Sequence, residues 1–170
     1  ALANNREPNI PDEPHIGYRA NNALSAHNQP IVKPSDSSEE FQYEGELVAI
    51  IGKEAKNISE EEALDFVFGY TIGNDVSERK WQRDDRTMWR AKNADTFKPM
   101  GPWIETDVNL DNLITTVRLN NIETISFSTN SMIFGVARFI SAMSRYLTLV
   151  PGDMIWMGTE GHSKNMKVGD

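Results

Sequence analysis

One segment limits the possible folds of this chain more than any other, the stretch Tyr43–Gly52 with the sequence YEGELVAIIG. Its second half is apolar and rich in β-branched residues and it ends in glycine, which is typical of a buried β-strand. Glu44 and Glu46 stand two residues apart, so on a strand they face the same side. The sequence therefore predicts a strand that carries two carboxylates onto a surface that becomes apolar at Val48 and Ile50.

Two carboxylates at the start of a buried strand need a positive charge or water nearby to stabilise their negative charges. Burying unpaired negative charges is costly, and the two groups also repel each other. A hard divalent cation bound through oxygen ligands is one solution. An exposed strand end, where water solvates both acids, is the alternative. The pair Glu44 and Glu46 leaves both interpretations open.

Asp75 is a third acid in a comparable position. It follows Gly73-Asn74 near the end of a second predicted strand, Tyr70–Val76. Taken alone, an aspartate there is typical of an Asx turn or a helix cap. Brought to the same place as the two glutamates, it would complete a three-carboxylate site with open positions, which suits Mg²⁺ or Mn²⁺. Zinc is less favoured, because no His or Cys stands nearby in the sequence.

Further polar residues are candidates for substrate contacts. Lys92 could stabilise an enolate or bind a carboxylate. Arg79 and Gln82, on the turn after Asp75, allow the same interpretation. Thr159 follows a glycine after an apolar strand, where backbone N–H groups and a hydroxyl could hold a carboxylate. For each of these residues the alternative is an ordinary surface side chain.

The remaining elements favour an α+β fold that is mostly β. Asn120-Asn121 predicts a hairpin turn, because Asn tolerates positive φ. Apolar residues at helical spacing predict a helix over 133–143, and residues 154–157 form a short apolar strand. Strands dominate without a βαβ rhythm, so we expect a curved mixed sheet or barrel.

A second helix is predicted after Ser59. Ser59 and Glu62 have the spacing of a capping box, in which each side chain satisfies a backbone donor of the first helical turn. Leu64 would lie on the buried side of this helix. Residues 84–92, in contrast, are charged and predicted to be irregular.

The composition of the chain argues against several classes of binding partner. The formal net charge of −8 argues against nucleic acid and against an anionic membrane as partners. The chain has no cysteine, which excludes disulfides and thiolate metal sites. It shows no apolar signal segment and no apolar run of membrane-spanning length, so we expect a cytoplasmic protein. We expect a tail or linker over residues 1–14 and one domain over 15–170.

Four motifs together resemble the fumarylacetoacetate hydrolase family. They are YEGEL at Tyr43–Leu47, GYTIGNDVSER at Gly69–Arg79, AKNADTFKPMGPW at Ala91–Trp103 and LVPGDMIWMGT at Leu149–Thr159. They occur in the family's order and at compatible spacing, and the resemblance covers Pro30–Asp170. It implies a mixed β-roll or barrel-like sandwich with a few flanking helices, and usually a homodimer.

The resemblance also implies a function. It points to an enzyme that acts on a small anionic 2-oxo or 2-hydroxy-dienoic acid, as in the catabolism of aromatic compounds. The reaction would be C–C cleavage, decarboxylation or isomerisation through a stabilised enolate. A metal-binding and ligand-binding protein without turnover is the alternative. The resemblance assigns Lys92 as the catalytic residue, Arg79, Gln82 and Thr159 to the substrate pocket, and Glu44, Glu46 and Asp75 as ligands of Mg²⁺ or Mn²⁺.

Two departures from the family pattern affect these expectations. Hydrolases of the family carry a His and a Glu that activate water on a lid segment, and Ala23 and Ala26 stand at those positions here, with His27 out of register. Isomerase or decarboxylase chemistry therefore gains weight against hydrolysis. The family's catalytic region also continues past a Gly-Asp like Gly169-Asp170, so we expect the chain to be incomplete at this end.

Overall fold

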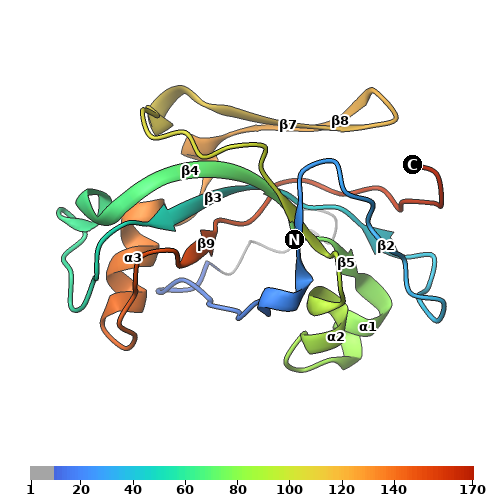
Figure 1. The fold of residues 1–170 in the computed structure, drawn as a ribbon, viewed down its shortest axis with the longest axis horizontal. Helices are drawn as coiled ribbons and strands as arrows, with labels where there is room; N and C mark the ends of the chain where they lie inside the picture. The colour runs from blue at the N-terminus through green and yellow to red at the C-terminus, as the bar shows by residue number, and fades with distance from the viewer. Residues whose placement is uncertain (1–9) are drawn as a thin grey trace.

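The computed structural model describes residues 10–170, so most of the predicted tail over 1–14 lies outside the described residues. Its centre is a five-stranded sheet (Figure 1). The strands are, in order across the sheet, β1 (Leu24–Ala26), β6 (Lys98–Met100), β4 (Val67–Asn74), β3 (Gly45–Ile51) and β9 (Met154–Trp156). Only the β1–β6 pair is parallel, so the sheet is mixed.

Two smaller antiparallel pairs complete the β structure. They are β2 (Phe41–Gln42) with β5 (Ser77–Glu78), and the hairpin of β7 (Ile114–Leu119) with β8 (Ile122–Ser128). The expected α+β class with mostly β structure is confirmed, and within residues 10–170 the sheet stays open rather than closing into a barrel. The hairpin turn is confirmed too, because Asn120 and Asn121 have φ values of 51° and 64°.

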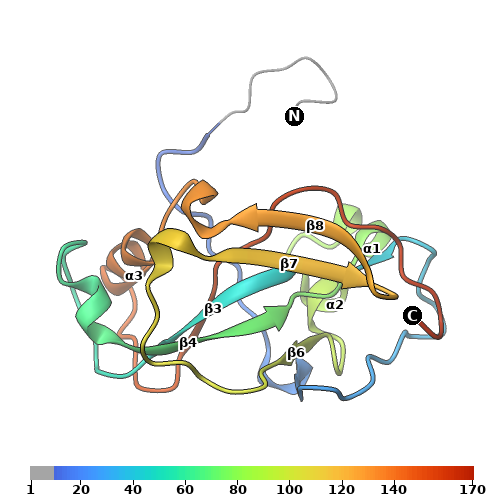
Figure 2. The same cartoon turned by 90° about the horizontal axis from the view of Figure 1, so that it is seen from above.

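The helices are short, and among residues 10–170 none is long and apolar enough to cross a bilayer. The hairpin β7–β8 lies on one side of the curved sheet, with helices α1 (Arg79–Asp84) and α2 (Trp89–Asn93) and the N-terminal segment on the other (Figure 1). Seen from above, α3 (Val136–Ser144) lies at the opposite end of the molecule from α1 and α2 (Figure 2). The helical elements are α1 (Arg79–Asp84), α2 (Trp89–Asn93), α3 (Val136–Ser144) and the 3₁₀ turns η2 (Asn21–Ala23), η3 (Ala63–Phe66), η4 (Leu110–Asn112) and η5 (Thr129–Ser131).

Strand β3 is buried along its whole length, and its two faces have different tasks. Leu47, Ala49 and Ile51 belong to the main apolar core, together with Val136 and Ile140 of α3. Next to them Gly45 lies under the hairpin, because a Cβ atom there would meet the side chain of Val117. Since alternate residues face opposite sides, Glu44 and Glu46 point away from the hairpin.

The prediction of an α-helix after Ser59 is wrong, because the structure has only a 3₁₀ turn there. Only half of the capping box forms. The Glu62 N–H donates to Ser59 Oγ at 3.3 Å, but the Glu62 carboxylate accepts the Ser59 hydroxyl at 2.9 Å rather than the Ser59 backbone N–H. These contacts lead only into the single turn η3, because β4 begins at Val67 and leaves no room for an α-helix. Leu64 is correspondingly 47% exposed rather than buried.

The stretch 84–92 is also more regular than predicted, because α2 begins at Trp89. The Asp85 side chain explains part of this order. Its Oδ2 accepts the backbone N–H groups of Arg90 at 2.9 Å and Ala91 at 3.2 Å, which satisfies donors of the first helical turn.

Candidate metal centre and substrate pocket

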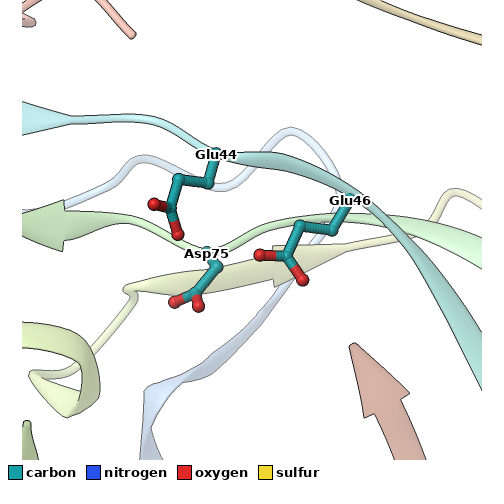
Figure 3. A group of neighbouring side chains, drawn as sticks. All are labelled: Glu44, Glu46 and Asp75. Carbon is teal, nitrogen blue, oxygen red and sulfur yellow. The ribbon is translucent and has the colours of Figure 1, made fainter. Parts of the chain in front are cut away.

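The three predicted acids meet where β3 and β4 pair (Figure 3). Glu46 lies in β3 opposite Gly73 of β4, while Glu44 precedes β3 and Asp75 follows β4. The Asp75 N–H donates to Glu44 O at 2.8 Å and continues the ladder beyond the strand ends. One carboxylate oxygen from each acid lies within 4.8 Å of the others, a distance that one bound cation could span.

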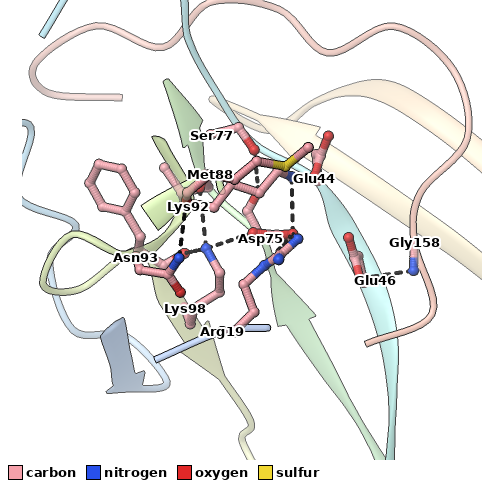
Figure 4. Close-up of polar contacts among 12 residues, drawn as sticks. Arg19, Glu44, Glu46, Asp75, Ser77, Met88, Lys92, Asn93, Lys98 and Gly158 are labelled. Atoms are coloured by element: carbon pink, nitrogen blue, oxygen red, sulfur yellow. Dashed lines mark hydrogen bonds and ion pairs between the residues drawn. The ribbon is translucent and has the colours of Figure 1, made fainter. Parts of the chain in front are cut away.

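Lys92 and Arg79 hold Glu44. Arg79 Nη2 lies 2.6 Å from Glu44 Oε1, and Lys92 Nζ lies 2.5 Å from Glu44 Oε2. Lys92 Nζ also reaches Asp75 Oδ2 at 3.0 Å, so this lysine bridges two of the three acids (Figure 4). Lys92 is only 5% exposed, which rules out the ordinary surface lysine considered above.

Asp75 has two further cationic partners. Arg19 contacts Oδ2 through Nη2 at 2.8 Å and Nε at 3.2 Å, and Lys98 Nζ lies 2.6 Å from Oδ1. Burial alone would raise the pKa of Asp75, but Lys98, Lys92 and Arg19 outweigh it and lower that pKa to about 2. Burial lowers the pKa of Lys98 to about 8, against the opposing effect of Asp75.

Glu46 differs from the other two acids. It is 3% exposed, and among residues 10–170 no cationic side chain lies within ion-pair distance of it. Its Oε2 accepts the Gly158 N–H at 2.9 Å. Burial, followed by the charge of Asp75, raises the pKa of Glu46 to about 8, and the Gly158 hydrogen bond offsets this only in part. Glu46 is thus the acid that the described residues leave without a cationic partner, and its raised pKa keeps it mostly protonated at neutral pH.

The acids open into a cavity of about 720 Å³. Thr159 borders it, and its hydroxyl is buried without a hydrogen-bond partner within the described part of the chain. The cavity therefore offers carboxylates, two cationic side chains and a free hydroxyl beside an apolar wall. Its lining includes Gln82, Lys92 and Thr159, then Phe139, Met143 and Trp156, and from the N-terminal segment His15, Tyr18 and Arg19.

The sequence-predicted residues fall into two groups. Glu44, Glu46, Asp75 and Lys92 are brought into direct contact or close proximity, and Gln82 and Thr159 line the same cavity. Arg79 is not among the lining residues. Its guanidinium instead donates to the side chains of Gln42, Gln82 and Glu44, at 2.8, 2.8 and 2.6 Å. Its role in substrate binding stays a prediction.

Two side chains at the site were missed by sequence reasoning, Arg19 and Lys98. Backbone N–H groups beside Thr159 were predicted to be able to hold a carboxylate, and in the structure the Gly158 N–H donates to the carboxylate of Glu46. A signal for Lys98 existed, because a lysine between Phe97 and Pro99 interrupts an otherwise apolar stretch. Nothing in the polar segment around Arg19 marks it as a partner of a residue 56 positions away.

The positions expected for a water-activating pair contribute no acid or base. Ala23 is fully buried in a small apolar cluster, and Ala26 is an exposed residue at the end of β1. His27 does not border the cavity, whereas His15 does.

These features define a class of protein: an open, mostly antiparallel sheet whose central strands present three carboxylates suited to a hard divalent cation. The chain matches the family described as fumarylacetoacetate (FAA) hydrolase C-terminal over residues 1–170. It is 41% identical over 170 residues to a fumarylacetoacetate hydrolase domain-containing protein 2 homolog of Dictyostelium discoideum, across 92% of this chain and 55% of that protein.

Solved structures of similar proteins have the same fold. A 5-carboxymethyl-2-hydroxymuconate delta-isomerase from Mycobacterium smegmatis superposes with a TM-score of 0.89 at 35% identity, over 96% of this chain and 65% of that one. A maleylpyruvate hydrolase from Sphingobium sp. SYK-6, in complex with manganese(II) and pyruvate, has a TM-score of 0.78 at 30% identity, over 87% of this chain and 55% of that one.

The chain belongs to the fumarylacetoacetate hydrolase family. It spans 55% of the length of its Dictyostelium relative.

Proposed function

We propose that the protein is a divalent-metal-dependent enzyme that acts on a small 2-oxo or 2-hydroxy-dienoic acid, with Glu44, Glu46 and Asp75 as the metal ligands. The observation that carries the proposal is Glu46, a buried acid without a cationic partner in the described chain, beside two other carboxylates. Without a cation this carboxyl group stays mostly protonated at neutral pH, and a cation bound beside it would favour the ionised form. Three carboxylates form an oxygen ligand set that suits Mg²⁺ or Mn²⁺.

The residues around the acids have distinct tasks in this proposal. When bound, the cation supplies Lewis acidity that favours negative charge on the oxygen atoms of a 2-oxo acid. Lys92 adds a second positive charge beside the developing enolate, where it counts more in the transition state than in the ground state. Thr159 offers its unpartnered hydroxyl to the substrate. Arg79 fixes Glu44 from behind and orients the amide of Gln82.

We infer that isomerisation or decarboxylation fits this pocket better than hydrolysis. Both reactions pass through an enolate but require no activated water. Alanine occupies both positions where the family's hydrolases carry the water-activating His and Glu. The pyruvate in the manganese-containing neighbour is itself a 2-oxo acid, which supports this class of substrate.

The choice of metal, the assembly and the compartment belong to the same proposal. The manganese complex of the neighbour favours Mn²⁺, and the oxygen ligand set accommodates Mg²⁺ equally well. We propose a homodimer located in the cytoplasm. In support of self-association, Phe68 and Ile72 on one face of β4 are 55% and 51% exposed. Light scattering in solution tests the dimer.

A second candidate function is ligand binding without turnover. The missing acid and base at Ala23 and Ala26 favour it. Turnover of any member of a panel of 2-oxo and 2-hydroxy-dienoic acids in the presence of Mg²⁺ or Mn²⁺ would exclude this alternative.

Titration calorimetry with Mn²⁺ tests the metal centre. Glu46→Gln should weaken binding at least tenfold, because it removes a charged ligand while keeping the size of the side chain. The control is Glu39→Gln, whose side chain is 88% exposed. If both variants bind Mn²⁺ as the wild type does, Glu46 does not belong to a metal site.

A further inference from the structure

Lys98 is a fully buried lysine behind the acids, 0% exposed, and it does not border the cavity. Its Nζ lies 2.6 Å from Asp75 Oδ1 (Figure 4). The same ammonium donates to Val76 O at 3.3 Å and Phe97 O at 3.2 Å. Three oxygen atoms therefore surround a charge that has no access to water.

These contacts fix the ammonium group in place. Val76 and Phe97 are tied to each other, because the Val76 N–H donates to Phe97 O at 3.0 Å. The end of β4 and the start of β6 thus form a backbone cradle around Nζ. A buried ammonium is stable only when it is paired and hydrogen-bonded, so the Asp75–Lys98 pair is a permanent part of the fold.

The two oxygen atoms of Asp75 consequently have different surroundings. Oδ1 contacts buried Lys98, whereas Oδ2 contacts Lys92 and Arg19, and both of these residues border the cavity. A cation entering from the cavity meets Oδ2 first, and it can displace the side chains found there. It cannot displace Lys98, which has no path to solvent.

We infer that Lys98 is a positioning residue of the metal centre: it occupies Asp75 Oδ1, so that Asp75 offers the metal only Oδ2, and its charge weakens metal binding. The inference rests on the proposed metal site. Two effects act in the same direction. One ligand oxygen is withheld, and a fixed positive charge behind the ligand repels a dication. The site would therefore bind its metal loosely and exchange it readily.

The test is Mn²⁺ calorimetry on Lys98→Met, which keeps the length and the apolar stem of the side chain. We expect Mn²⁺ to bind tenfold or more tightly than in the wild type. Lys56→Met is the matched control, because Lys56 is exposed and borders neither the cavity nor the acids, and its affinity should not change. Unchanged or weaker binding in Lys98→Met overturns the inference.

Melting temperatures separate this role from a purely structural one. Without metal, Lys98→Met should melt lower than the wild type, because buried Asp75 Oδ1 loses the positive charge of its ion-pair partner. Saturating Mn²⁺ should recover most of that loss. An equal loss with and without Mn²⁺ indicates a lysine that only supports the fold and overturns the inference.

A second variant keeps the test decisive if Lys98→Met does not fold. Lys98→Gln removes the charge and can still donate hydrogen bonds within the cradle, and the same tighter binding is expected of it. Failure of the metal site itself would look different, because the wild type would then bind no Mn²⁺. A wild type that binds Mn²⁺, together with a Lys98 variant of equal affinity, refutes the role of Lys98 alone.

Discussion

The affinity of the site for Mn²⁺ should rise steeply with pH, because Glu46 has to lose a proton before it can act as a ligand. Its pKa is about 8 in the metal-free protein, against an ordinary value of 4.5. The other two acids are paired with cations, and Asp75 keeps a low pKa. Proton release on metal binding should therefore come from Glu46.

The size of this pH dependence follows from the fraction of Glu46 that is ionised. With a pKa of about 8, roughly one tenth is ionised at pH 7 and roughly one hundredth at pH 6. Mn²⁺ binding should thus weaken about tenfold for each pH unit below 8, which corresponds to about 1.4 kcal/mol per unit. Above pH 8 this dependence should level off.

Calorimetry at pH 6, 7 and 8, in two buffers that differ in ionisation enthalpy, measures both the affinity and the protons released. About one proton should be released at pH 7, where Glu46 is mostly protonated. Glu46→Gln should lose this dependence below pH 8. Lys98, whose pKa is also lowered to about 8, is still present in Glu46→Gln, so any pH dependence that this variant keeps below pH 8 would come from Lys98. If the affinity of the wild type for Mn²⁺ stays constant from pH 6 to 8, Glu46 does not have to lose a proton to bind the metal, and this reasoning is refuted.

The shifted pKa values of Glu46 and Asp75 also make the stability of the metal-free protein depend on pH. Glu46 has a raised pKa when folded, so its stabilising contribution is complete below about pH 4.5 and is lost as the pH rises through 8. Asp75 has a lowered pKa, so its contribution is present above its ordinary value of 3.8 and is lost as the pH falls toward 2. Without metal, the melting temperature should therefore fall as the pH rises toward 8 and also as the pH falls toward 2.

Two further variants test individual side chains. Lys92→Met should lower turnover by about 10²-fold, the scale of a lost electrostatic stabiliser, while Mn²⁺ affinity is maintained or increased; turnover near that of the wild type would remove Lys92 from the mechanism. Ser59→Ala should cost at most about 1 kcal/mol in urea unfolding and leave turnover unchanged, because its contact with Glu62 only caps a short turn far from the acids. A loss of activity without a loss of stability would assign Ser59 a functional role.

Local patterns identified most of the elements that build the site. The alternation in β3 placed Glu44 and Glu46 on one face, and the tolerance of Asn for positive φ predicted the turn at Asn120-Asn121. Both depend on a few consecutive residues. The predicted helix after Ser59 failed because its capping residues were read without the strand that begins eight residues later, at Val67. Tertiary pairing overrode a correct local signal.

The cations around Asp75 depend on contacts that local patterns do not encode. Lys98 becomes a partner of Asp75 only because β6 pairs with β4, and Arg19 only because the N-terminal segment crosses the cavity. Neither pairing could be deduced from spacing. Lysine in an apolar context indicates that a buried partner exists, but it does not say which acid this is.

The charges around the three acids explain how a chain with a net negative charge could bind the proposed anionic substrate. The whole chain carries −8, yet within residues 10–170 two of the three acids, Glu44 and Asp75, are contacted by four cations, Arg19, Arg79, Lys92 and Lys98. A bound dication adds two further positive charges beside Glu46. The field inside the cavity is then set by these groups rather than by the net charge, because low-dielectric walls confine it. In the proposed enzyme, the positive charges that would weaken metal binding would also attract a negatively charged 2-oxo acid, so that the site could release its metal readily and still bind an anion.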